Sequence, residues 1–271
     1  MASVQAEMKS SASYLEKLFG LKEKVAVVIG GSGVLGGRIA EGLAGAGAKV
    51  AVVYRGSRDA AERCVESMRV LGAEAMVVPA DVQHREDLDN ARDTVLKRWG
   101  RVDILVNAPG VNSATPLLEI TEEEWDRILG TNLKGVFLAC QVFGRAMIEG
   151  GGGGSILNIS SVSSRVPLSK VFTYSISKAG LDNLTRFLAR EWAPHSIRVN
   201  ALMPGFFPAG QNRHILTEER RKAIFTHTPM ARYGEPDELC GAAILLASER
   251  ASSFITGATI VVDGGFTAMT I

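Results

Sequence analysis

A phenol and an ammonium group stand four residues apart in the stretch YSISK, from Tyr174 to Lys178. Residues at positions i and i+4 of a helix lie on one face, so a helix here would bring the two side chains together. Free tyrosine has a pKa near ~10, and a neighbouring cation lowers that pKa because it favours the phenolate. Such a pair could exchange a proton near neutral pH. Taken alone, the spacing is better explained as an ordinary exposed helix pair, so the surrounding sequence has to decide.

A second stretch with chemical potential is the glycine loop GGSGVLGG, which follows the apolar run 24–30 and precedes a helical pattern. Glycine allows a tight turn and a close backbone approach to a pyrophosphate, and the helix N-terminus adds N–H groups and the positive end of its dipole. The acid that would bind the ribose of NAD about 20 residues later is replaced by Tyr54, with Arg55 and Arg58 following. This pattern favours NADP(H) over NAD(H). The alternative is that both arginines lie on a solvated loop.

The elements that would position these stretches alternate regularly along the chain. Seven short β-branched runs are expected to be strands, at 24–30, 49–54, 74–80, 103–108, 155–160, 197–204 and 259–263. Helical patterns lie near 36–46, 59–71, 85–99, 121–149, 174–193 and 236–248. Several strand runs are apolar throughout, as expected when both faces of a sheet are covered. The alternation predicts an α/β fold, a single doubly wound Rossmann domain whose seven-stranded parallel sheet has helices on both faces.

Composition narrows the class of protein. The chain has 271 residues, 46% of them hydrophobic, and a net charge of +1, which gives no general attraction for nucleic acid or an anionic membrane. Cys64, Cys140 and Cys240 form no C-x-x-C pair, so no metal site or disulfide framework is predicted. No apolar run reaches the ~18 residues of a membrane span, and residues 1–20 lack the apolar core of a secretory signal. We therefore expect a cytoplasmic protein with an N-terminal arm at 1–20 and one catalytic domain at 21–271.

In this order and spacing the motifs resemble those of the short-chain dehydrogenases/reductases, from about Leu21 to the C-terminus. The matching pieces are the glycine loop, DV at 81–82, NAPG at 107–110, TNLKG at 131–135, NISS at 158–161, YSISK, PG at 204–205 and the closing VDGG. The resemblance implies hydride transfer between a nicotinamide cofactor and a carbonyl or secondary alcohol. It makes Tyr174 the general acid/base, Lys178 its partner, Ser161 the hydroxyl that orients the substrate, with Ser160 less favoured, and Asn132 the fourth catalytic residue.

The resemblance also implies a set of cofactor contacts, with Asp81 and Val82 near the adenine and Asn107 near the ribose. The full set is Gly30, Ser32, Gly33, Val34, Leu35, Gly36, Tyr54, Arg55, Asp81, Val82, Asn107, Ala108, Gly110, Tyr174, Lys178, Pro204, Gly205 and Phe207. Three motifs depart from the usual pattern. Ile29 replaces a threonine, Val34 replaces the middle glycine, and NAPG stands for NNAG. These departures alter how the loop meets the pyrophosphate and leave the acid/base set intact.

The segment 206–230, after PG, usually shapes the substrate pocket in this family. Its polar residues include Gln211 and Arg213, which together with Asn112 and Ser161 are expected to contact the substrate; Asn212, His214, Ser113 and Thr115 could add to the same pocket. A pocket rich in hydrogen bonds suits a polyol, a sugar or a sugar acid, with a carboxylate facing Arg213. The stretch is loosely similar to sugar-acid oxidoreductases of the mannonate/fructuronate kind. The alternative is that 211–222 forms a solvent-facing lid helix.

Two other functions stay open at this point. A 3-oxoacyl thioester is a second substrate class, and Phe206 and Phe207 are compatible with its apolar channel. A non-catalytic nucleotide-binding sensor on the same fold belongs to a different class of protein, but it would be expected to lack Tyr174, Lys178 or Ser161. The resemblance further implies a homotetramer or homodimer, assembled through the long helices near 121–149 and 174–193 and through the VDGG end.

Overall fold

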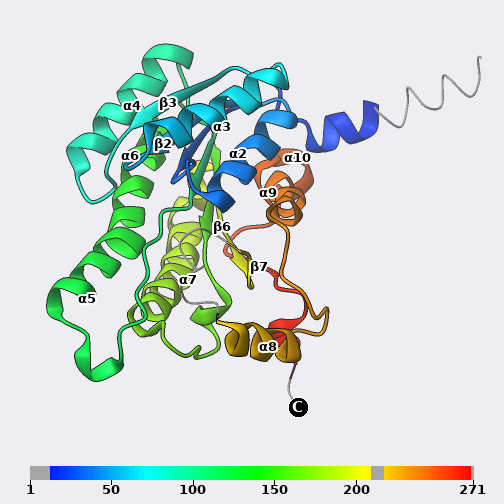
Figure 1. Ribbon diagram of the computed structural model, residues 1–271. Coiled ribbons are helices and arrows are strands. Elements are labelled where there is room, and N and C mark those ends of the chain that lie inside the picture. The colour runs from blue at the N-terminus through cyan, green and yellow to red at the C-terminus, as the bar shows by residue number, and fades with distance from the viewer. Residues whose placement is uncertain (1–12, 209–216, 270–271) are drawn as a thin grey trace, which may run out of the picture.

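The computed structural model describes residues 13–208 and 217–269, which contain one parallel sheet of seven strands (Figure 1). The strand order is β3-β2-β1-β4-β5-β6-β7. The strands are β1 Val25–Ile29, β2 Lys49–Tyr54, β3 Ala75–Pro79, β4 Ile104–Asn107, β5 Gly154–Ile159, β6 Ile197–Pro204 and β7 Thr259–Val262. All seven coincide with the predicted runs to within one residue at their starts, so the doubly wound parallel sheet is confirmed.

Helices cover both faces of the sheet, which explains why its central strands are apolar throughout. One face carries α2 (Val34–Gly45), α3 (Arg58–Val70) and α9 (Cys240–Ala247), and the other carries α4 (Arg85–Trp99), α6 (Gly135–Glu149) and α7 (Phe172–Trp192) (Figure 1). Each face has its own hydrophobic core, and the residues of β1 contribute alternately to the two. In the described part of the chain, no helix combines the length and the apolar character required to cross a bilayer.

The strand order reverses at β1, which pairs with β2 on one side and with β4 on the other. Ile29 is in register with Asn107, so the glycine loop and the segment 108–110 leave the sheet side by side. In doubly wound folds, such a reversal opens a crevice at the carboxyl ends of the strands, where ligands bind. The fold therefore predicts a ligand site at the carboxyl ends of β1 and β4.

The run 121–149 was predicted as one helix, and the structure divides it. The helix α5 (Glu122–Leu129) continues into a π-helical turn at Gly130–Lys134 and then into α6. The Thr121 hydroxyl caps α5 by accepting a hydrogen bond from the Glu124 amide at 3.2 Å. π-Helical turns inside α-helices are often found at functional sites, and this one contains Asn132.

The helix α8 (Glu218–His227) lies apart from the two helical layers, beyond the carboxyl ends of the strands (Figure 1). Thr217 caps it, because its hydroxyl oxygen accepts a hydrogen bond from the Arg220 amide at 3.3 Å. The sequence left open whether 211–222 forms a lid helix. Residues 218–222 are helical, and 211–216 lie outside the described residues.

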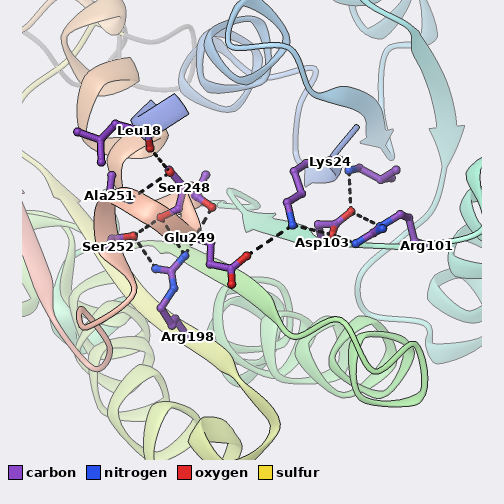
Figure 2. Close-up of polar contacts among 11 residues, drawn as sticks. Leu18, Lys24, Arg101, Asp103, Arg198, Ser248, Glu249, Ala251 and Ser252 are labelled. Carbon is purple, nitrogen blue, oxygen red and sulfur yellow. Dashed lines mark hydrogen bonds and ion pairs between the residues drawn. The ribbon is translucent and has the colours of Figure 1, made fainter. Parts of the chain in front are cut away.

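Polar contacts also tie neighbouring segments to the sheet at the amino-terminal ends of its strands (Figure 2). Arg198 of β6 is 8% exposed and donates to the Leu246 carbonyl at 2.8 Å and to the Ser252 hydroxyl at 2.7 Å, which ties α9 and α10 (Glu249–Ser252) to the sheet. A cation at a helix C-terminus is also favoured by the helix dipole. The Ser248 hydroxyl donates to the Leu18 carbonyl at 2.6 Å, so helical residues 13–19 are attached at the same place.

Candidate active site

A cavity of about 430 Å³ opens at the carboxyl ends of β1, β4, β5 and β6. Its walls come from the glycine loop, the segments that follow β4, β5 and β6, the first turns of α7, and α8. Most of the residues predicted for the site line it: Gly30, Ser32, Gly33, Val34, Leu35, Gly36, Ala108, Gly110, Asn112, Ser161, Tyr174, Lys178, Pro204, Gly205 and Phe207. The fold thus brings residues from many separate segments of the chain together around one cavity.

Two positions of the glycine loop need glycine for steric reasons. Gly30 has a left-handed φ of 74°, and a Cβ there would lie 2.7 Å from the Ala108 carbonyl oxygen. A methyl group on Gly36 would collide with the Gly30 carbonyl oxygen. The loop ends at Gly33, the N-cap of α2, which has no side chain to cap the first turn. Its open N–H groups and the positive end of the dipole suit a pyrophosphate, so these residues fit a dinucleotide.

Val34 stands where the resemblance expects the middle glycine. It begins α2, lines the cavity and keeps 43% of its surface exposed. A side chain is therefore accommodated at this position. Ile29, which replaces the expected threonine, is buried in the core at the end of β1.

Four further residues predicted to hold the cofactor lie outside the cavity, at the ends of β2 and β3. Arg55 is about half exposed, and its Nη1 lies 3.5 Å from Asp81 Oδ2. Asp81 Oδ1 also accepts a hydrogen bond from the Gln83 amide at 3.0 Å. Tyr54 and Val82, in contrast, are buried, and their side chains belong to the two hydrophobic cores. Arg55 and Asp81 are thus the polar side chains that this end offers to a ligand.

Tyr174 and Lys178 lie near the start of α7 and on one face of it, as their spacing predicts. Lys178 Nζ lies 5.6 Å from the centroid of the Tyr174 ring. The amine is buried and donates a hydrogen bond to the Ile159 carbonyl at 2.7 Å, so the end of β5 fixes its position. Ser161, two residues further along, interacts with the Tyr174 phenol and acts to lower its pKa. One helix and one strand end therefore hold all three groups together.

Burial has the largest effect on both titrating groups. It raises the pKa of Tyr174, and the hydrogen bond with Ser161 offsets only part of this rise. It lowers the pKa of Lys178 from 10.5 to about 8, while the charge of Asp182 acts in the opposite direction. The Tyr–Lys spacing predicted a pKa of Tyr174 below its ordinary value. This expectation was wrong for the protein without ligand, because desolvation of the phenolate is the larger effect.

The turn that carries Ser161 is itself fixed by hydrogen bonds. Ser161 Oγ accepts bonds from the Ser163 amide at 3.2 Å and from the Ser163 hydroxyl at 3.1 Å. The Ser164 hydroxyl donates to Asp182 Oδ2 at 2.6 Å, which ties the turn to α7. Ser160, the less favoured candidate, also lines the cavity, and its buried hydroxyl has no partner among the described residues.

Asn132 lies in the π-helical turn and is fully buried. Its Oδ1 accepts from the Val111 amide at 2.9 Å, and its Nδ2 donates to the Val111 carbonyl at 2.9 Å and to the Ser177 hydroxyl at 3.1 Å. The Ser177 hydroxyl in turn donates to the Tyr174 carbonyl at 2.6 Å. Asn132 therefore connects the segment after β4 with the start of α7.

Asn107, predicted to lie near the ribose, does not line the cavity. Its Nδ2 donates to Asn158 Oδ1 at 2.9 Å, and Asn158 Nδ2 donates to the Thr185 hydroxyl at 2.9 Å. The side chain is fully buried between β4 and β5, and its Oδ1 has no partner among the described residues. Asn107 thus begins a buried polar chain that reaches α7.

The expected substrate contacts are placed only in part. Asn112 lines the cavity, but Ser113 and Thr115 do not; their hydroxyls donate to the two carboxylate oxygens of Glu124, at 2.7 Å and 2.6 Å. Glu124 therefore anchors the loop that carries Asn112 to α5. Gln211 and Arg213 lie outside the described residues.

Some residues that line the cavity were not predicted to contact a ligand, among them Leu168, Val171, Arg220 and Tyr233. They come from three separate segments of the chain, and the fold brings them together. Arg220 stands in the run ERRK, where the sequence offers no sign of which basic residue turns inward.

Comparison with known proteins agrees with this geometry. Residues 32–267 match a short-chain dehydrogenase family model described as "Enoyl-(Acyl carrier protein) reductase". The chain is 37% identical over 269 residues to "Uncharacterized oxidoreductase UxuB" of Bacillus subtilis, covering 92% of this chain and 96% of that one. It is 37% identical over 190 residues to 2-dehydro-3-deoxy-D-gluconate 5-dehydrogenase of Escherichia coli, covering 70% and 75% of the two chains.

A solved structure is also similar, that of a gluconate 5-dehydrogenase from Burkholderia cenocepacia in complex with NADP and tartrate. The TM-score is 0.89 at 34% identity, over 94% of this chain and 100% of that one. Together with the matched family model and the identities above 30%, this establishes the relationship. The chain belongs to the short-chain dehydrogenase/reductase family, whose members are oxidoreductases that bind a nicotinamide cofactor.

Proposed function

We propose that this enzyme uses NADP(H) to interconvert a carbonyl and a secondary alcohol on a polyol, a sugar or a sugar acid. The observation that carries the proposal is that Ser161, Tyr174 and Lys178 line the same cavity as the glycine loop. The names of two relatives, which refer to gluconate derivatives, support the substrate class.

We assign proton transfer to Tyr174. A bound nicotinamide dinucleotide supplies or accepts the hydride. In reduction, the Tyr174 hydroxyl donates its proton to the carbonyl oxygen, and burial, by raising the pKa of Tyr174, keeps the phenol protonated for this step. In oxidation, the phenolate accepts the alcohol proton. The Ser161 hydroxyl donates a hydrogen bond to the same substrate oxygen and stabilises the charge that develops there.

Lys178 would stabilise the phenolate form of Tyr174. A group with a pKa of about 8 is still mostly protonated at neutral pH, so the buried amine carries its charge where it is needed. Asn132 would position the residues around it, because its three hydrogen bonds hold the segment after β4 and the start of α7 in place.

The dinucleotide would lie across the carboxyl ends of the strands. The open first turn of α2 would bind the pyrophosphate, Asp81 the adenine, and Arg55 the 2′-phosphate that distinguishes NADP from NAD. Arg58 pairs with Glu62 at 2.7 Å, whereas Arg55 is half exposed beside Asp81. The complex of the related gluconate 5-dehydrogenase with NADP supports this preference.

A 3-oxoacyl thioester is the second candidate substrate. Leu168, Val171 and Phe206 give one side of the cavity an apolar character, and the description of the family model names an acyl carrier protein. A non-catalytic sensor is disfavoured, because Ser161, Tyr174 and Lys178 all line the cavity.

We further propose a homotetramer or homodimer, with residues 21–271 as its catalytic domain and the cytoplasm as its location. Large apolar side chains are exposed on the outer face of α7, namely Phe172, Ile176 and Phe187, and Phe137 is exposed on α6. Exposed apolar surface of this kind commonly marks an interface between subunits. Light scattering of the purified protein would give the number of subunits.

The function is tested by turnover of a substrate panel with each cofactor. The panel contains 5-ketogluconate, fructuronate, a neutral ketose and an acetoacetyl thioester, each with NADPH and with NADH. We expect reduction of the sugar derivatives, faster with NADPH. Turnover of the thioester alone would instead support the second candidate, and no binding of either dinucleotide would contradict both.

A further inference from the structure

The charges around the cavity are one-sided. Among the described residues that line it, Lys178 and Arg220 are the only charged ones, and both are basic. Lys178 is buried and bound to the Ile159 carbonyl, beside the phenol that it serves. Arg220 enters from α8, on the side of the cavity formed by the segment between Ser161 and Tyr174. A cavity with two cations and no carboxylate among its described lining favours an anionic ligand.

Arg220 is held in this position by hydrogen bonds to neutral groups. Its Nη1 donates to the Ser169 hydroxyl at 3.1 Å, and its Nη2 donates to the Ser169 carbonyl at 3.0 Å. Its neighbour Arg221 instead pairs with Glu218 of the same helix. Within the described part of the chain, Arg220 has no carboxylate partner, so its charge is not compensated by the protein there. A planar guanidinium fixed on one edge can still bind a carboxylate through its remaining N–H groups.

Tyr233 adds a second polar group to the same wall. It lines the cavity, and its ring packs edge-on against Phe225 of α8, with ring centroids 4.8 Å apart. Its hydroxyl is buried and has no hydrogen-bond partner among the described residues. Leaving a buried hydroxyl unpaired costs free energy, which a ligand with hydroxyl groups would recover. The two side chains together match a carboxylate next to hydroxyl groups.

We propose that Arg220 binds the carboxylate of the substrate and that Tyr233 bonds a neighbouring hydroxyl, so that the preferred substrates are polyhydroxy acids rather than neutral polyols. This inference rests on the proposed function, because it assumes that the bound acid is the molecule that reacts. The binding experiment below does not depend on that reaction. It assigns the carboxylate to an arginine of α8; Arg213, which the sequence suggested for this role, lies outside the described residues. The pyrophosphate of the cofactor has its own site at the glycine loop, which lies on a different wall of the cavity.

Binding of tartrate and of threitol to the enzyme–NADPH complex tests the inference by calorimetry. The two molecules differ only in carrying two carboxylates or two CH2OH groups, and NADPH cannot oxidise either. We expect wild-type enzyme to bind tartrate more tightly than threitol, and Arg220→Met to weaken tartrate binding by about 10- to 100-fold, since a hydrogen bond to a charged group is lost. Threitol binding should stay unchanged. Arg220→Lys should restore part of the tartrate affinity, and Tyr233→Phe should weaken both ligands.

Arg221→Met is the matched control, because it removes a neighbouring arginine that pairs with Glu218, and it should leave tartrate binding as in wild type. Ser169→Ala keeps the charge of Arg220 and removes one of its acceptors, which separates loss of charge from loosening of the wall. The inference is overturned if Arg220→Met binds tartrate as tightly as wild type, or if wild type does not prefer tartrate over threitol. If tartrate binding depends on Arg220 but no sugar derivative is turned over, the proposed reaction fails and the binding site stands.

Discussion

Replacing Lys178 by methionine removes a buried ammonium group without opening a large cavity. Because burial lowers the pKa of Lys178 from 10.5 to about 8, the charged amine costs the folded protein about 3 kcal/mol at neutral pH. The folded protein releases this proton near pH 8, and the unfolded chain releases it only near 10.5, so the cost is relieved as the pH rises between these values. The free energy of unfolding of wild type should therefore rise by about 2–3 kcal/mol relative to Lys178→Met between neutral pH and pH ~10.

Urea unfolding followed by tryptophan fluorescence, at both pH values, measures this difference. Lys134→Met is the matched control, because Lys134 is exposed and its replacement should give the same difference from wild type at both pH values. Lys178→Met should also lose most of its turnover, since the phenolate would lack its cation. If the stability difference between wild type and Lys178→Met did not change with pH, burial would not lower the pKa of Lys178, and this account of the amine would be wrong.

Three further predictions concern the amine of Lys178, the carboxylate of Glu124 and the glycine loop. The kcat/KM for NADPH in reduction should fall above pH ~8, because the Lys178 amine loses its charge there, and a flat profile to pH ~9.5 would contradict this. Glu124→Gln should raise the KM for the carbonyl substrate by about 3- to 10-fold with little change in kcat, because the loop after β4 loses a charged acceptor; Glu123→Gln, at an exposed neighbour, should do nothing. Gly36→Ala should lower the affinity for NADPH more than about tenfold and destabilise the fold by about 1–3 kcal/mol, whereas Gly45→Ala, with open space around it, should do neither; fluorescence titration and urea unfolding decide.

The elements of the fold could be predicted because their signals are local. The strands are continuously apolar runs between turns, and the glycine loop and the Tyr–Lys spacing are short motifs. The π-helical turn could not be predicted from the local sequence. Its residue Asn132 contacts Val111 and Ser177, and both of these lie far from it in the sequence. The spacing of apolar residues predicts a helix over this stretch, but it does not show that a π-helical turn lies between α5 and α6.

The electrostatics of the site also needed the structure. The spacing of Tyr174 and Lys178 predicts that they meet, but the direction of each pKa depends on how deeply the fold buries them. The sequence favoured Arg213 for the substrate because it follows a known motif. Only the packing of α8 on the cavity, fixed by Ser169, indicates that Arg220 lines it.

Turnover and cofactor binding of Tyr174→Phe test the central claim most directly. The substitution removes one hydroxyl and keeps the ring that lies beside Lys178. We predict that kcat falls by about 10²- to 10⁴-fold while the Kd for NADPH stays within about twofold of wild type, because the phenol moves the proton whereas many other residues of the cofactor set remain to hold the dinucleotide. Turnover within about tenfold of wild type would contradict the account, since a general acid is expected to contribute more than that.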